Sequence, residues 1–318
     1  MDATTGKDEV TKVVTNHVDK ENSVATKNDI TRAITTPQSN GLAAINLFDE
    51  KELAVVENFL TKIVRSEKGG IKSVNDGLAI LMRAKDFDLP FSSCIEHVHV
   101  INGKTGIDIH LIKALLLRAG CRWECTKDYQ PLYEYTDGIN VYNDGSFPQY
   151  VIRCVSKAEA EKKRADDKEH DVVYVWPVKW YADFNGNKYR DYQLNNNYII
   201  INTKQEAIAV AQQKKIGVYR IANQPIDFIT EYKIYRNING KECFAIGHFS
   251  FSDAQKAEMF SKDTYIKYAR ILIGHRAFTY AARDIGSDLL MGVMETNELR
   301  IVTNTPINEQ EFIEAEVI

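Results

Sequence analysis

Residues 249–299 read FSFSDAQKAEMFSKDTYIKYARILIGHRAFTYAARDIGSDLLMGVMETNEL, and this stretch organises the rest of the chain. No proline interrupts the run from Asp263 to Asp284, which predicts a long helix. Four basic side chains punctuate its apolar and aromatic surface: Lys267, Arg270, Arg276 and Arg283. Arg276 and Arg283 are seven residues apart and fall on nearly the same helix face. Arginine beside aromatics such as Tyr280 suits phosphate contact and base stacking, but the pattern is also typical of an ordinary amphipathic helix.

The composition is that of a soluble globular protein. The chain has 318 residues, of which 44% are hydrophobic and 26% charged, enough for one large domain or two small ones. No apolar run approaches the length of a membrane span, and the first residues, MDATTGKDEVTKVV, hold no signal-peptide core. We therefore expect a cytoplasmic protein without a membrane partner. The five cysteines are an odd number and are scattered, which favours reduced thiols over disulfides.

The net charge of −4 argues mildly against nucleic-acid binding, for which a basic footprint is expected. Its distribution weakens that objection. The last residues, INEQEFIEAEVI, carry Glu309, Glu311, Glu314 and Glu316 and no basic residue. Such a tail lowers the net charge without affecting a basic groove elsewhere in the chain.

The order of sequence patterns predicts an α+β fold in which antiparallel hairpins and meanders pack against helices, with the long basic helix near the C-terminus. Three Asn-Gly pairs between alternating segments mark hairpins, at Asn102-Gly103, Asn185-Gly186 and Asn239-Gly240. Helices are expected at 49–66, 73–87, 111–120 and 204–215. We expect a flexible arm over 1–45, a core over 46–300 and a short acidic tail over 301–318. We find neither the strand–helix alternation of doubly wound folds nor an internal repeat.

Catalytic and metal motifs are weak in this sequence. Cys94, His97, His99, His110, Cys121 and Cys125 could supply zinc ligands, but the two last cysteines have C-x₃-C spacing and no paired C-x₂-C modules occur. Asp183, Asp191 and Glu231 could be imagined as a Mg²⁺ cluster, although nothing in their spacing requires it. The sequence contains no phosphate-binding loop, no G-x-S-x-G and no H-E-x-x-H. We therefore predict no catalytic set and no bound metal.

Two clusters interleave aromatic and basic residues in predicted strands. Proteins that bind single-stranded nucleic acid combine a cationic track with aromatic stacking platforms. Tyrosine and tryptophan also fill the cores and edges of ordinary sheets, so both interpretations stay open. The first cluster is Trp176, Lys179, Trp180, Tyr181, Lys188, Tyr189, Arg190 and Tyr192, and the second is Tyr232, Lys233, Tyr235 and Arg236.

The C-terminal stretch resembles the RecT/Red-beta (Bet) family of phage single-strand annealing recombinases. The matching features are DAQKA at 253–257, Tyr268, Arg270, Leu272-Ile273, Arg276-Ala277, Ala282-Arg283-Asp284, Gly292, Val293, Glu295 and Glu298. The chain departs from the family pattern at Tyr265, where tryptophan is usual, and at Ala269, where proline is usual. Ile271 occupies a position where a second basic residue is common. Residues 77–122 follow the opening pattern of the family more loosely, and 155–215 is longer than the family pattern.

The resemblance implies a single-strand annealing protein core that binds single-stranded DNA and anneals complementary strands without ATP. It implies a homo-oligomer, as a ring or helical filament, holding single strands and the annealed duplex intermediate. A partner exonuclease and a host single-strand binding protein are the expected companions, in a bacterial cell with a phage or prophage gene. No cofactor is expected, with Mg²⁺ only assisting DNA binding. The expected DNA-binding residues are Lys267, Arg270, Arg276, Arg283, Arg118, Arg122, Lys179, Lys188 and Arg190.

Two alternatives remain open from the sequence. One is a metal-dependent nucleic-acid enzyme, such as a nuclease, that uses the His/Cys cluster or the strand carboxylates. The other is a scaffold protein whose C-terminal helix is merely amphipathic.

Overall fold

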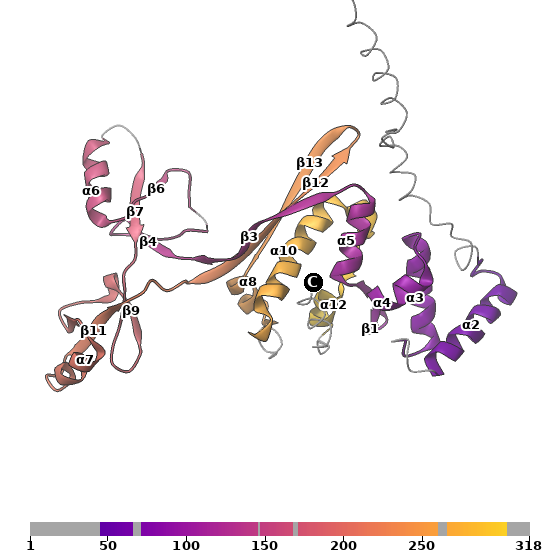
Figure 1. Cartoon of the computed structure of the whole chain (residues 1–318), viewed down its shortest axis with the longest axis horizontal. Helices are drawn as coiled ribbons and strands as arrows, with labels where there is room; N and C mark the ends of the chain where they lie inside the picture. The colour runs from indigo at the N-terminus through magenta and orange to yellow at the C-terminus, as the bar shows by residue number, and fades with distance from the viewer. Residues whose placement is uncertain (1–44, 66–70, 146, 168–170, 260–265, 304–318) are drawn as a thin grey trace, which may run out of the picture. The chain divides into compact units, whose positions relative to one another are not determined.

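A computed structural model describes residues 45–65, 71–145, 147–167, 171–259 and 266–303. Most of the expected N-terminal arm and of the acidic tail therefore lies outside the described residues. The chain divides into two compact units, residues 1–96 and 97–318, so the expected core of 46–300 contributes to both. Helices and mainly antiparallel sheets together confirm the α+β class (Figure 1).

The first unit is helical. Its elements are α2 (Glu50–Arg65), α3 (Val74–Asp86) and most of α4 (Phe91–His97), so the two helices predicted in this region are confirmed. Ser73 caps α3 by accepting a hydrogen bond from the Asp76 N–H at 3.1 Å. The fully buried Leu60 packs against Gly77, where an added Cβ would lie 2.7 Å from a Leu60 methyl carbon. This close approach explains why α3 carries a glycine despite its low helix propensity.

The second unit begins with the first predicted hairpin. Strands β1 (Val98–Ile101) and β2 (Lys104–Ile107) pair antiparallel around Asn102-Gly103, both in the left-handed region with φ of 49° and 76°. These angles are what a two-residue type I′ turn requires, so the Asn-Gly prediction is confirmed. Helix α5 (Ile109–Arg118) follows, capped by Asp108, which accepts from the Leu111 N–H at 2.8 Å. Strand β14 (Met294–Glu295) returns from the C-terminal region to pair parallel with β2.

A three-stranded antiparallel sheet forms the centre of this unit. Strand β12 (Asp227–Ile238) lies between β3 (Arg122–Leu132) and β13 (Lys241–Ser250), and the hairpin turn between β12 and β13 is the predicted Asn239-Gly240. Helices α8 (Phe251–Lys256) and α10 (Ala269–Ile285) pack on the sheet. Figure 1 shows α10 running along one side of β12 and β13. The short α11 (Ser287–Leu290) and α12 (Thr296–Val302) complete the unit.

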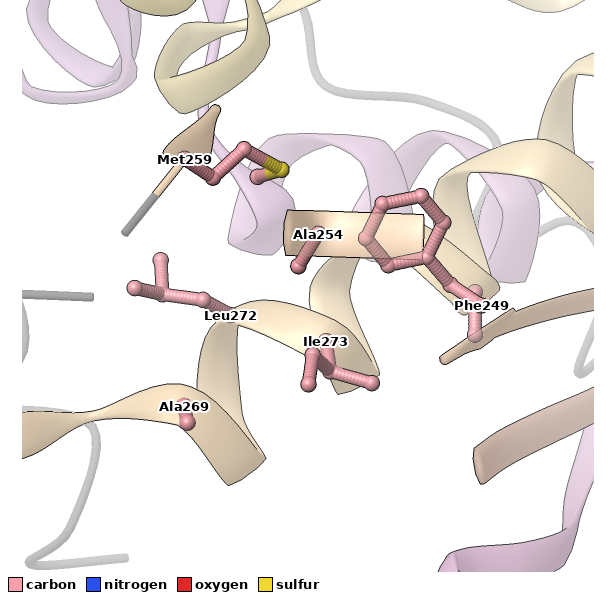
Figure 2. Close-up of a cluster of buried hydrophobic side chains, with 7 residues drawn as sticks. Phe249, Ala254, Met259, Ala269, Leu272 and Ile273 are labelled. Atoms are coloured by element: carbon pink, nitrogen blue, oxygen red, sulfur yellow. The ribbon is translucent and has the colours of Figure 1, made fainter. Parts of the chain in front are cut away.

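The helix predicted over 263–284 differs from the one observed. Residues 263–265 lie outside the described residues, Ile266 and Lys267 are helical, and Tyr268 forms a turn before α10 begins at Ala269. Apolar packing sets this start. Figure 2 shows Ala269, Leu272 and Ile273 on the first turns of α10 gathered with Ala254 of α8, Met259 and Phe249 of β13. Burying these apolar side chains is favourable, and it offsets the conformational entropy lost when the end of α8 and the start of α10 become ordered.

Residues 133–226 form an insert between two neighbouring strands. Leu132, the end of β3, lies opposite Asp227, the start of β12, so the chain leaves and re-enters the central sheet at one point. The insert contains two small sheets. One has the order β5 (Val141–Asn143), β4 (Glu134–Thr136), β7 (Val173–Pro177), β6 (Val151–Arg153), and the other β10 (Tyr198–Ile201), β11 (Ile216–Ile221), β8 (Trp180–Ala182), β9 (Lys188–Arg190).

Each small sheet contains a parallel pair, which the sequence did not predict. Strands β6 and β7 are parallel and joined through α6 (Lys157–Asp166), and β10 and β11 are parallel and joined through α7 (Lys204–Ala211). The expected antiparallel hairpins and meanders therefore do not account for these two pairs. The strands of these β–α–β units have three to six residues. Hydrophobic periodicity over such short segments carries little information on direction. Within the described residues, no helix is long and apolar enough to cross a membrane.

Candidate nucleic-acid interface

The two faces of the central sheet have different surroundings. In an antiparallel sheet, residues directly opposite one another share a face. Trp123, Ile234 and Ala245 are opposite one another and face α10, where Trp123 meets the Phe278 ring edge-on at a centroid distance of 5.2 Å. The other face, here named the open face, carries the alternate residues. Its members include Arg122, Glu124, Lys127, Glu231, Lys233, Tyr235, Glu242, Phe244, Ile246 and His248.

Aromatic side chains on the open face remain in solvent. Phe244 is 57% exposed, and its neighbour Ile246 is 47% exposed. Tyr235 lies directly opposite Phe244, with ring centroids 6.2 Å apart. Tyr235 is half-buried, but leaving Phe244 and Ile246 in water has a hydrophobic cost, and neighbouring exposed apolar side chains are typical of a binding surface. The open face is therefore a candidate binding surface.

Two cations lie over these rings. The Arg122 guanidinium carbon is 3.7 Å from the Tyr235 ring centroid, and the Lys233 Nζ is 4.1 Å from that of Phe244. Cation–π contacts of this kind hold long side chains flat against a ring. Arginine over an aromatic ring is also an arrangement on which a nucleobase can stack.

Acidic residues neutralise much of the charge on the open face. Glu242 pairs with Arg122 at 2.9 Å, and Glu231 pairs with Lys127 at 2.7 Å. Glu124 accepts a hydrogen bond from the Tyr235 hydroxyl. Of the basic side chains that contact the rings, Lys233 has no carboxylate partner in the described part of the chain. A ligand would thus be held here more by stacking than by net charge.

The arginines of α10 mostly have structural partners. Arg276 is 7% exposed and binds the Glu298 carboxylate of α12 at 3.1 Å, and Arg283 also pairs with Glu298. Arg276 cannot reach a phosphate without leaving the core, so its predicted role as a DNA contact is corrected to one of joining α10 to α12. This pairing connects three residues of the 249–299 stretch, Arg276, Arg283 and Glu298.

The two other basic residues near the start of α10 are exposed. Arg270 pairs with Asp128 of β3, and this pairing holds the pKa of the Asp128 carboxyl below its usual value. Lys267 is exposed on the preceding helical residues, and Arg118 is exposed at the end of α5. Of the basic residues predicted as DNA contacts, only Arg122 lies on the open face.

The remaining predicted contacts belong to the insert. Lys188 donates to the Gln224 side chain at 2.6 Å. Arg190 pairs with Glu134 and lies 4.6 Å from the Trp180 ring centroid, and Lys179 is exposed just before β8. The structure thus gathers these three around one of the small sheets of the insert, apart from the strands that make the open face.

The candidate metal ligands do not converge. His97 binds Asp108 through Nδ1 at 2.7 Å, and its ring centroid is 6.4 Å from that of His110. Cys94 is buried in the first unit, and burial raises the pKa of its thiol to about 11, far from a thiolate ligand. Among the described residues, no three His, Cys, Asp or Glu side chains are placed to hold a metal ion together.

The carboxylates that were considered as a Mg²⁺ cluster also have separate roles. Asp183 is buried in the β8–β9 turn, where it accepts from the N–H groups of Asn185 and Asn187 at 2.8 and 3.0 Å. Burial alone would raise its pKa, but these hydrogen bonds and one from Tyr189 lower it. Glu231 of β12 pairs with Lys127 of β3. Asp183 therefore shapes a turn, and Glu231 ties two strands of the central sheet together.

A buried acid lies beside the arginine pairs. Glu295 is 2% exposed and caps α12 by accepting from the Glu298 N–H at 3.1 Å. Burial raises its pKa to about 7, while hydrogen bonds and Arg276 oppose that rise and Glu298 adds to it. A folded-state pKa above the usual 4.5 contributes stability that is present below pH 4.5 and lost as the pH rises through 7.

Glu295→Gln should therefore gain stability relative to the wild type as the pH rises. We expect the difference in free energy of unfolding between variant and wild type to grow by roughly 3 kcal/mol from below pH 4.5 to above pH 7. Urea unfolding at several pH values measures it. Glu242→Gln, which removes an exposed carboxylate of the open face, serves as the control for the loss of one negative charge. An equal difference at all pH values would contradict the buried, proton-binding role of Glu295.

The sequence patterns missed half of the open face. Lys233 and Tyr235 belong to the predicted aromatic–basic cluster, whereas Phe244, Ile246 and His248 were not singled out. A signal was present in KECFAIGHFS, where large side chains alternate with Ala245 and Gly247. Small residues mark the face that a helix approaches closely, which leaves the large ones facing outward.

Comparisons of this chain with protein-family models, with curated proteins and with solved structures found no match.

Proposed function

We propose that this chain binds single-stranded DNA through the open face and promotes annealing of complementary strands without ATP. The observation that carries the proposal is the exposed Phe244 beside the half-buried Tyr235, with Arg122 and Lys233 over the two rings. Stacking on exposed aromatics binds any base, because every base has a π-face. This tolerance suits an annealing protein, in which base pairing between the strands provides the sequence specificity.

The resemblance of 253–298 to the RecT/Red-beta family supports the same proposal. Under it, the chain is a member of that family, acts as a homo-oligomer and works with an exonuclease and a host single-strand binding protein in a bacterial cell. Arg276 and Arg283 brace α10 against α12, and the β12–β13 hairpin provides the main DNA contacts.

An annealing assay tests the proposal. Complementary oligonucleotides that carry a fluorophore and a quencher should anneal faster with the protein than without it, in the absence of ATP. The double variant Tyr235→Ala/Phe244→Ala should lose most of the acceleration, because each stacked base contributes about 1–3 kcal/mol. Tyr150→Ala removes an exposed tyrosine from the insert and should behave as the wild type.

Failure of the wild type to accelerate annealing would refute the proposed activity. Acceleration that survives in the double variant would instead refute the assignment of the open face. Cleavage of the oligonucleotides that a chelator abolishes would support the nuclease alternative.

A further inference from the structure

In the described part of the chain, no strand pairs with the outer edge of β13. In the sheet order, β13 has β12 on one side and no described strand on the other. Lys241 and Ile238 flank the two-residue turn and lie opposite one another, which makes them a hydrogen-bonded pair. Hydrogen-bonded pairs recur at every second residue, so the backbone groups of the odd-numbered residues of β13 hydrogen-bond to β12. The even-numbered ones point their N–H and C=O groups away. Ser250 confirms this parity, since its N–H donates to the Asp253 carboxylate at 3.1 Å.

A groove runs along this edge. It has a volume of about 700 Å³, and it is bounded by the 246–249 segment of β13, by Asp253, Lys256 and Ala257 at α8, and by Tyr280, Arg283 and Asp284 of α10. The floor is partly apolar, because Tyr280 meets the Phe249 ring edge-on at a centroid distance of 5.8 Å. The outward backbone groups of Ile246 and His248 lie at its rim. A long edge strand of this kind is a template for strand addition unless something covers it.

The C-terminal residues have the pattern of a strand suited to this groove. In Phe312–Val317, the apolar Ile313, Ala315 and Val317 alternate with Phe312, Glu314 and Glu316. Such alternation is typical of a strand with one apolar and one mostly acidic face. A strand added antiparallel to β13 would turn its apolar side chains toward Tyr280 and Phe249. Glu314 and Glu316 would then share the open face with His248 and Lys233.

The tail also starts within reach of the groove. Arg283, which lines the groove, pairs with Glu298, and the described chain ends at Thr303, five residues farther along. The residues between Thr303 and Phe312 can span roughly 3.3 Å each when the chain is extended. We propose that the tail of the same molecule, residues 312–317, adds to the edge of β13 as a strand. Its glutamates then compete with DNA for the open face.

Amide hydrogen exchange in the absence of DNA tests the addition of the tail strand to β13, which does not rest on the proposed function; only the competition with DNA rests on it. In the full chain, the Ile246 and His248 amides should exchange slowly. They should exchange at least about tenfold faster in a chain ending at Thr303, which corresponds to about 1.4 kcal/mol of protection. Amides of the β1–β2 hairpin serve as an internal reference for any general loosening.

A matched pair of full-length variants isolates the strand. Glu314→Pro and Glu314→Gln both remove the charge, but only proline removes the N–H that would face β13. We expect the Ile246 and His248 amides to exchange as fast in Glu314→Pro as in the truncated chain, and as slowly in Glu314→Gln as in the wild type. Equal exchange at Ile246 and His248 in all these proteins would overturn the inference. Protection that grows with protein concentration would also overturn it, since a second molecule would then occupy the edge.

Discussion

Gly247→Ala is expected to destabilise the second unit by about 3 kcal/mol, near the upper end of the usual cost of overpacking. Gly247 lies on β13 where α10 crosses it, and an added Cβ would overlap the Ala277 carbonyl oxygen and the Ala281 nitrogen. Both are backbone atoms of a helix and cannot rotate aside as a side chain can. The sheet and helix would have to separate, and the contacts of Tyr232 with Phe278 would loosen with them.

Thermal or urea unfolding measures this effect, and Gly274→Ala provides a matched control. Gly274 lies within α10, and an added Cβ there would meet nothing within 4 Å. Alanine at that helical position should stabilise the protein by about 0.5–1 kcal/mol, because glycine is a poor helix former. If Gly247→Ala unfolds like the wild type, α10 does not approach β13 as closely as described.

Arg276→Ala should also destabilise the protein strongly, by about 3–5 kcal/mol, the usual cost of removing one member of a buried ion pair. Arg276 and Glu298 have side chains that are 8% and 14% exposed, so little water can replace the lost partner. Arg283 retains its pairing with Glu298 and moderates the loss. Arg283→Ala should cost less, because that side chain is 31% exposed and is partly solvated already.

Arg276→Ala also distinguishes a structural role of Arg276 from a role in contacting DNA. Below its melting temperature, Arg276→Ala should bind a labelled single-stranded oligonucleotide as the wild type does. Arg276→Met keeps the packing volume and should recover part of the stability. If Arg276→Ala melts like the wild type but loses DNA affinity, Arg276 contacts phosphate, and its assignment to the core is wrong.

Local patterns predicted the parts of this fold that local chemistry determines. Asn102-Gly103 and Asn239-Gly240 turn where expected, because few residue pairs adopt two successive positive φ angles at low cost. The helices of the first unit follow their apolar spacing and the cap at Ser73. Each of these features depends on a few neighbouring residues.

The sequence patterns did not predict which segments or side chains far apart in the chain pair with one another. The parallel pairing of β6 with β7 and of β10 with β11 depends on short strands that meet only in the folded chain. The partner of Arg276 is distant from it along the chain, and only the structure shows that Glu298 binds both Arg276 and Arg283. A basic residue on an amphipathic helix has the same pattern whether it meets a phosphate or a buried carboxylate.

Photo-crosslinking of the wild-type protein to a single-stranded oligonucleotide tests the central claim most directly. Bases stacked on the open face lie against Tyr235 and Phe244, so cross-linked peptides should map to β12 and β13 between Lys233 and His248. A double-stranded oligonucleotide, whose bases are already stacked, should give far fewer cross-links there. Cross-links confined to the insert or to α10, with none in the β12–β13 hairpin, would contradict the account.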